Sequence, residues 1–149
     1  MEETLDLLTE EQLYKKTPQE ITTLLYQACI VNLEKSIVCI RNKEYMEANR
    51  LLQTCNDILY RLGAGINYEA GIIADQLEAL YDYMARNLIE ANIKKDIQKL
   101  EEILRILIDI KDAWNQAIEK GVDNQDRVVR KKILSYEQDY VTGSINRKK

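Results

Sequence analysis

The side chains of this sequence that could perform chemistry are its carboxylates, three cysteines and its tyrosines, because the sequence contains no histidine. Histidine is the usual general base and the commonest transition-metal ligand, so its absence argues against both kinds of site. Acidic pairs occur at 75–78 (DQLE) and at 101–102 (EE), where two carboxylates could act as acid and base. Solvated helix faces explain such pairs better, because Asp and Glu are rarely buried.

The cysteines, at positions 29, 39 and 55, lie in apolar stretches and lack zinc-type spacing. A cysteine nucleophile would need a histidine or another cationic neighbour in a cleft. These thiols are therefore expected to be small packing residues in a reducing compartment. The sequence also lacks a Walker loop and a GxGxxG motif. We expect no catalytic residue, no cofactor and no metal, and therefore not an enzyme.

The composition predicts a single all-α domain. The chain has 149 residues, 46% of them hydrophobic and 31% charged, with one proline and five glycines. Leu, Ile, Ala, Glu, Lys and Gln dominate, which favours helix. Thr17, Pro18 and Glu20 form the pattern of a capping box with proline at the first helical position.

Four helices follow from the caps and the apolar spacing. They run from Pro18 to about Arg41, from a cap at Asn42 to Gly63, from a cap at Asn67 to about Asn92, and from a cap at Asp96 to before Gly121. Short connections make neighbouring helices antiparallel, so an up-down-up-down four-helix bundle is expected. Trp114 is expected on the inward stripe of the last helix with Leu100, Leu104 and Leu107.

Both ends of the chain are expected to add to the bundle. Residues 1–121 are predicted to form one domain with a short N-terminal arm, residues 1–16, that contains a short helix. Residues 122–149 form a basic C-terminal extension, partly helical as a fifth helix or mobile. This extension carries a net charge of +3 and the remainder −7. An acidic body disfavours nucleic-acid binding. No signal peptide and no membrane insertion are predicted, so the default location is cytoplasmic.

The first long helix has more apolar surface than one core face requires. Tyr26 belongs to one stripe, with Ile30, Leu33, Ile37 and Ile40. A second stripe, well round the helix, contains Leu24, Val31 and Val38. Two explanations stay open: the chain's own termini cover the second stripe, or it lines a binding groove. The third helix raises the same question, because Tyr81 and Tyr83 lie on different faces.

These pieces, in this order, resemble the flagellin export chaperone family, the FliS proteins. The resemblance is carried by TPQEI at 17–21, LLY at 24–26, AN at 48–49, IN at 66–67, LYDYM at 80–84, LIEAN at 88–92 and DAWNQA at 112–117. It covers residues 14–118. In this sequence Tyr14 lies only four residues before Pro18, and the extension after Gly121 is longer than the motifs cover.

The resemblance implies a four-helix-bundle cytosolic chaperone that binds the C-terminal segment of flagellin, prevents its polymerisation and delivers it to the flagellar type III export gate component. Client helices would occupy surface grooves. The residues expected to bind the partner are Tyr14, Leu24, Tyr26, Val31, Val38, Asn49, Tyr83 and Asn87. The chain is expected to be a monomer or a weak homodimer. Two alternatives remain open. The first is a generic helical adaptor or homo-oligomerising bundle, and the second is a small enzyme whose cofactor the sequence does not indicate.

Overall fold

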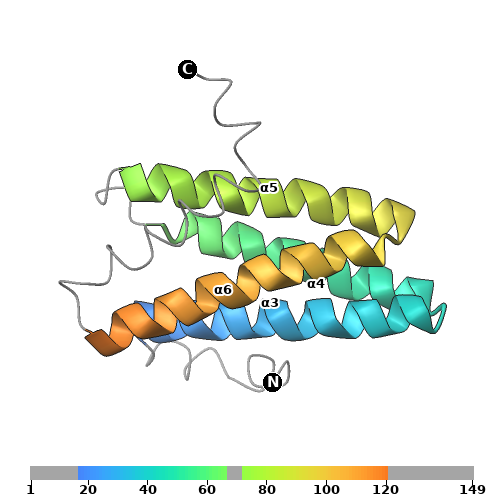
Figure 1. Ribbon diagram of the computed structural model, residues 1–149, viewed down its shortest axis with the longest axis horizontal. Coiled ribbons are helices and arrows are strands. Elements are labelled where there is room, and N and C mark those ends of the chain that lie inside the picture. The colour runs from blue at the N-terminus through green and yellow to red at the C-terminus, as the bar shows by residue number, and fades with distance from the viewer. Residues whose placement is uncertain (1–16, 67–71, 121–149) are drawn as a thin grey trace.

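Four antiparallel helices form an elongated bundle, as the sequence predicts (Figure 1). The structure is a computed structural model, and it describes residues 17–66 and 72–120. The helices are α3 (Pro18–Arg41), α4 (Tyr45–Ala64), α5 (Ile72–Lys94) and α6 (Ile97–Lys120). Neighbours along the chain pack together, and α6 returns to pack against α3. The helices therefore form a ring in which α3 and α5 are diagonally opposite.

The capping box at the start of α3 is formed. The Glu20 backbone N–H donates to Thr17 Oγ1 at 3.1 Å, and the Thr17 N–H donates to Glu20 Oε1 at 3.2 Å. Two N–H groups that a helix start leaves without partners are thereby satisfied. At α6, the Asp96 carboxylate accepts the Lys99 backbone N–H at 3.1 Å, which confirms the predicted cap. The predicted cap at Asn67 lies outside the described residues, as do the short N-terminal helix and the fifth helix.

The cap predicted at Asn42 is wrong, because Asn42 ends α3 instead of starting α4. Lys43 has a left-handed backbone with φ of 59°, and the Glu44 N–H returns to the Cys39 carbonyl at 2.8 Å. This is a Schellman motif, in which the left-handed position is usually glycine. Helix α4 then begins at Tyr45 without a side-chain cap.

The connection between α5 and α6 uses the same turn. Lys95 has φ of 52°, and the Asp96 N–H returns to the Ala91 carbonyl at 2.9 Å. The Lys95 ammonium also donates to the Asn92 carbonyl at 2.7 Å, which helps to hold the turn. Because the left-handed residue is Lys95, α5 ends at Lys94, slightly beyond the expected Asn92.

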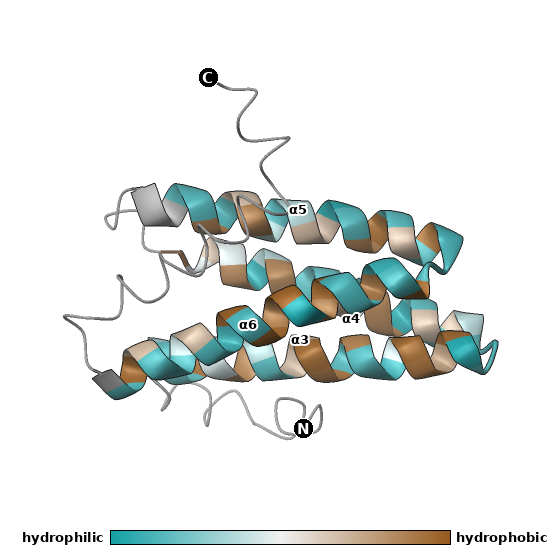
Figure 2. Ribbon diagram, viewed as in Figure 1, coloured by the Kyte–Doolittle hydropathy of each residue, from teal (hydrophilic) through white to brown (hydrophobic). Residues whose placement is uncertain are grey.

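The core fills the space between the four helices with Leu, Ile and small residues. Figure 2 shows hydrophobic residues recurring along each helix between hydrophilic ones. At the α3–α4 interface the buried residues include Ala28, Cys29, Ala48 and Cys55. The Cys55 thiol lies 3.6 Å from the Cys29 carbonyl oxygen, and the Cys29 thiol 3.8 Å from that of Cys55. Small side chains thus allow α3 and α4 to approach closely, and these two cysteines are packing residues.

Helix α3 is long and apolar enough to cross a membrane by length and composition alone. Half of its most apolar 18-residue window is buried inside the bundle. The residues of α3 that are buried are Leu25, Tyr26, Ala28, Cys29, Ile30, Asn32, Leu33, Ser36, Ile37 and Ile40. Packing against α4 and α6 therefore accounts for much of its apolar composition.

Trp114 lies at the seam between α6 and α3 and is only partly buried, unlike Leu100 and Leu107. Its indole N–H donates to Thr23 Oγ1 at 3.0 Å. Its ring meets that of Tyr26 edge to face, with centroids 6.2 Å apart. Trp114 packs against the core and is partly buried, as is Leu104, so it lies on the predicted inward stripe but at the edge of the core, where Thr23 gives its indole N–H a partner.

Tyr26 of α3 and Tyr81 of α5 meet across the bundle. Both are buried, with exposed fractions of 2% and 4%, and their hydroxyl oxygens are 2.5 Å apart. Burial raises the pKa of Tyr26 to about 12, although the hydrogen bond to Tyr81 opposes this shift. Burial, followed by the proximity of Tyr26, raises the pKa of Tyr81 well above its usual value. Both hydroxyls are therefore neutral at physiological pH, and each is the other's partner.

Replacement of Lys43 by glycine should stabilise the protein. A left-handed non-glycine residue costs roughly 1–2 kcal/mol, and the greater freedom of glycine in the unfolded chain offsets part of this. We expect Lys43→Gly to raise the free energy of unfolding by up to ~1 kcal/mol in urea titrations. Gln53→Gly, at an exposed helical position of α4, is the control and should lower it by about 1 kcal/mol. A loss of stability in Lys43→Gly would contradict the turn assignment.

The tyrosine pair should behave as one unit. Tyr26→Phe or Tyr81→Phe alone leaves one buried hydroxyl without its partner and should cost about 1–3 kcal/mol. The double Phe variant removes both hydroxyls and should cost clearly less than the sum of the two single changes, as measured by chemical denaturation. Tyr60→Phe, which changes a side chain that is 81% exposed, is the control and should have no effect. Additive losses would show that the hydroxyls do not interact.

Candidate functional site

The structure distributes the predicted partner-binding residues over three places. Leu24, Val31 and Val38 lie on the outer face of α3, Tyr26 lies in the core, and Asn49, Tyr83 and Asn87 lie on α4 and α5. Tyr14 lies outside the described residues. Because Tyr26 is 2% exposed, it packs inside the bundle and leaves almost no side-chain surface for a partner to contact.

The outer face of α3 runs between two grooves. Near its beginning, Leu24 borders a groove of about 510 Å³ whose other wall is on α6 and includes Ile118. Near its end, Val38 borders a groove of about 350 Å³ whose other wall is on α4 and includes Leu51. Residues seven apart drift by about 20° per step around an α-helix. The stripe therefore passes from the α6 side of α3 to its α4 side.

Exposure increases along this stripe. Leu24 and Val31 are half-buried, whereas Val38 is 53% exposed. An exposed valine at the border of a groove is apolar surface that the described part of the bundle does not cover. Such surface is typical of a protein–protein contact.

Charged residues border the groove at Val38. Arg50 donates to both carboxylate oxygens of Glu47, at 2.6 and 3.0 Å, and this hydrogen bonding lowers the pKa of Glu47. Cys39 also lines this groove. Burial, and then the nearby carboxylates of Glu44 and Glu47, raise the pKa of the Cys39 thiol. A nucleophilic cysteine needs the opposite shift, so the groove is better suited to binding than to covalent chemistry.

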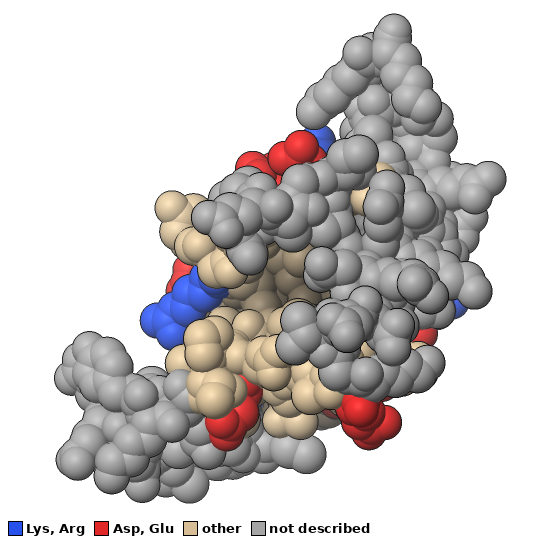
Figure 3. Space-filling view, turned by 90° about the vertical axis from the view of Figure 1, so that its left-hand side faces the viewer, with Lys and Arg blue, Asp and Glu red and all other residues tan. Residues whose placement is uncertain are grey.

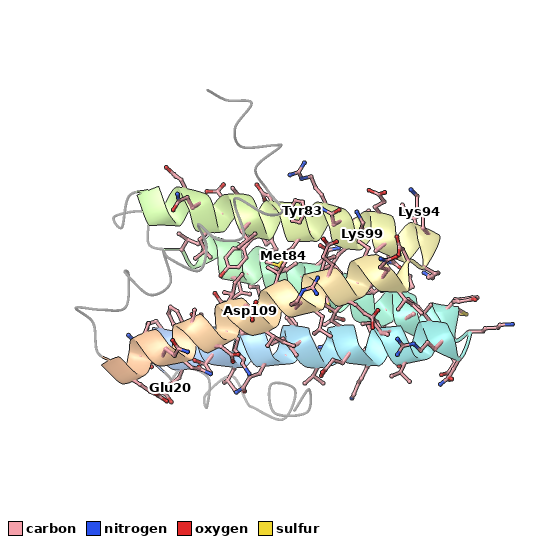
Figure 4. All side chains as sticks on the ribbon, in the orientation of Figure 1. Glu20, Tyr83, Met84, Lys94, Lys99 and Asp109 are labelled. Atoms are coloured by element: carbon pink, nitrogen blue, oxygen red, sulfur yellow. The ribbon has the colours of Figure 1, made fainter. Side chains whose placement is uncertain are left out.

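The asparagines of α5 connect helices. Asn87 donates to the Tyr83 carbonyl at 2.7 Å and accepts from the Lys99 ammonium of α6 at 3.0 Å. Figure 4 shows Lys99 between α5 and α6, with Tyr83 close to it on α5. Asn92 donates to Asn49 Oδ1 of α4 at 2.7 Å. The amides on α5 thus hold it to both neighbours, while Tyr83 packs half-buried against the core.

A second group of exposed apolar side chains lies on α4 and α5 and was not found from the sequence. Met46 is 90% exposed, Ile93 78% and Ile89 53%. Met46 is three residues before Asn49, and Ile89 and Ile93 lie within three residues of Asn92, so the hydrogen bond between the two asparagines puts all three at the same end of α4 and α5. The signal was present, because Ile89 and Ile93 are four residues apart and off the core stripe of Met84 and Leu88.

Figure 3 looks onto the end of the bundle where α3 begins and α6 ends. Uncharged side chains, drawn in tan, line a hollow in this face, and Lys or Arg side chains stand at its left edge. Within residues 17–66 and 72–120, no group of three His, Cys, Asp or Glu residues is arranged to hold a metal ion. The described surface therefore offers apolar grooves with charged borders, which is what a helical bundle presents to another polypeptide.

Comparison with known proteins identifies the class. The family model described as "Flagellar protein FliS" matches residues 3–121. The chain therefore belongs to the FliS family, and its extension after residue 121 lies outside the match.

Characterised relatives agree with this assignment. The chain is 34% identical to the flagellar secretion chaperone FliS of Bacillus subtilis over 111 residues, which is 74% of this chain and 81% of the relative. It is 30% identical to that of Vibrio cholerae over 108 residues, covering 72% and 79%. It is 28% identical to that of Salmonella typhimurium over 120 residues, covering 79% and 89%.

The reactivity of Cys39 should report its surroundings. Because its pKa is raised, the reactive thiolate forms only at higher pH than in a free cysteine. We expect the rate of alkylation by iodoacetamide in the folded protein to reach half its maximum at a pH above that of an unfolded control. Cys39→Ser should abolish rapid labelling, because Cys29 and Cys55 are fully buried. A midpoint below that of the unfolded chain would reveal an activated thiol.

Proposed function

We propose that this protein is a cytoplasmic, non-catalytic export chaperone that binds the C-terminal segment of flagellin. Binding keeps the segment from polymerising prematurely, and the complex is delivered to a component of the flagellar type III export gate. The proposal is supported by membership of the FliS family and by relatives that are named flagellar secretion chaperones.

The observation that carries the proposal is the apolar outer face of α3. Leu24, Val31 and Val38 are two helical turns apart, so they form anchors at intervals of about 10 Å. An amphipathic client helix uses anchors at similar intervals on its own apolar face. The grooves beside Leu24 and Val38 provide room for its side chains. A client segment lying along α3 would thus bury the apolar surface that the described helices leave exposed.

The asparagines have a different part in this proposal. Asn49 and Asn87 already hold α5 to its neighbours. Their remaining surface, with that of Tyr83, can orient a client by hydrogen bonds without supplying most of the binding energy. Apolar contacts on α3 supply affinity, and polar contacts on α5 supply selectivity.

A generic helical adaptor or a homo-oligomerising bundle would use the same outer face of α3 on another protein or on itself. We propose a monomer or a weak homodimer. Sedimentation at several concentrations separates a homo-oligomer from a monomer, because the mass of a self-associating protein rises with its concentration. Stable self-association that Val38→Glu abolishes would favour the alternative.

Two substitutions of equal exposure test where the client binds. Val38 on α3 and Ile89 on α5 are both 53% exposed, so a charge at either position should leave folding intact. Val38→Glu should weaken binding of a flagellin C-terminal peptide at least tenfold, about 1.4 kcal/mol, because a buried unpaired charge is costly. Ile89→Glu is the matched control and should leave this affinity unchanged. Isothermal titration calorimetry measures both, and coupled folding should give a negative heat-capacity change.

Other results are equally informative. A lower melting temperature for Val38→Glu with unchanged affinity would show that the chain's own termini cover the stripe. Loss of affinity in Ile89→Glu alone would move the client site to the seam of α4 and α5. No binding by the unaltered protein would defeat the chaperone proposal.

A further inference from the structure

The groove between α4 and α5 has an unbalanced charge. It has a volume of about 550 Å³ and lies between the C-terminal half of α4 and the middle of α5. Among the described residues that line it, three are acidic, Asp57, Glu78 and Asp82, and none is Lys or Arg. Three carboxylates around one depression create a negative potential that favours a cationic occupant.

Arg86, the arginine nearest to Asp82 along α5, does not pair with the Asp82 carboxylate. Arg86, one turn beyond Asp82, directs its Nε to the Asp82 main-chain carbonyl at 3.4 Å. Within residues 17–66 and 72–120, neither the Asp57 nor the Asp82 carboxylate forms an ion pair. The groove therefore has two carboxylates available for a cation from outside the described bundle.

The floor of the groove is apolar and aromatic. Leu59 and Tyr81 are buried at its base, and Tyr60 is 81% exposed at its edge. An exposed tyrosine ring can contact an aliphatic chain or receive an arginine guanidinium on its face. The groove thus suits a segment that combines Val, Ile or Leu with Arg or Lys.

The chain's own extension has this composition. Residues 127–134 read RVVRKKIL, with four basic residues, four aliphatic residues and no acidic one. They lie outside the match to the family model, so this property is not one that the model describes. We propose that residues 127–134 dock in the acidic groove between α4 and α5 of the same molecule.

The topology allows this contact. Helix α6 ends at the end of the bundle where α4 ends and α5 begins (Figure 1). The six residues between Lys120 and Arg127 span up to ~20 Å when extended. This length is about the combined width of two helices. The extension therefore starts at the end of the bundle toward which Gly63 and Ala64 of the groove lie.

The proposal does not depend on flagellin binding, because no described residue that lines the groove is among those proposed to bind the client. Docking would place the basic residues of the extension against the acidic body of the chain. It would also exclude other basic peptides from this groove.

The extension itself provides a matched control. The tripeptide Arg-Lys-Lys occurs twice, at 130–132 and at 147–149. One full-length variant carries Arg130→Gln, Lys131→Gln and Lys132→Gln, and the other Arg147→Gln, Lys148→Gln and Lys149→Gln. Both lose the same charge from the same extension. We expect only the first to change the backbone amide NMR shifts of residues 56–64 and 78–85, and 1 M salt should produce the same changes in the unaltered protein.

A peptide of residues 125–136 tests occupancy. Added to the first variant, whose own segment is neutralised, it should shift the groove amides. In the unaltered protein it should bind at least threefold more weakly, because an occupied groove reduces the apparent affinity. Asp57→Asn with Asp82→Asn should abolish peptide binding in both.

Three results would overturn the proposal. Equal effects of the two Gln variants would show a general charge effect of the extension. Unchanged groove amides in the first variant would show that the segment is not docked there. Loss of the groove signal on dilution would assign the occupant to a second copy of the chain instead of the same molecule.

Discussion

The contact between the Tyr26 and Tyr81 hydroxyls joins two helices that sit diagonally opposite in the bundle. Each ring must be buried to fill the centre, and each hydroxyl must have a partner because burial without one is costly. That requirement sets the rotation of α3 and α5 relative to each other. With Tyr26 turned inward, Thr23 meets the Trp114 indole at one edge, and Val38 and Leu24 turn outward. The apolar outer face of α3 is thus a consequence of how its inner face is paired.

Much of the fold was predictable from local chemistry. The capping box at Thr17 and the cap at Asp96 depend on residues within one turn, so their signals are complete in the sequence. The turn at Lys43 was missed, because a left-handed lysine carries no signal where glycine is the usual residue. Helical periodicity placed Trp114 on the inward stripe, but periodicity gives direction and not depth, so only the structure shows that Trp114 is partly buried.

The candidate site was less predictable, since exposure depends on neighbours distant in sequence. Val38 and Val31 belong to one stripe, but only the structure shows that Val38 is the more exposed. Asn87 and Asn49 were expected to bind a partner, and in the structure their side chains hold α5 to α6 and to α4. A polar side chain on a helix can serve a partner or its own fold, and the spacing is the same in both cases. The acidic groove between α4 and α5 is lined by residues from two helices, so no short stretch of the sequence has a pattern that predicts it.

The two tight turns at Lys43 and Lys95 lie at one end of the bundle. The first and last residues of the described bundle, Thr17 and Lys120, lie at the opposite end. Helices α3 and α6 are neighbours, so a force applied between these two points would separate them from their shared end. Contacts would then break one turn at a time, as a zipper opens, instead of all together as in shear. The same bundle can be thermodynamically stable and yet yield to a weak pull along this one direction. Mechanical resistance in this protein is therefore set by where the chain enters and leaves, and not by the size of its core.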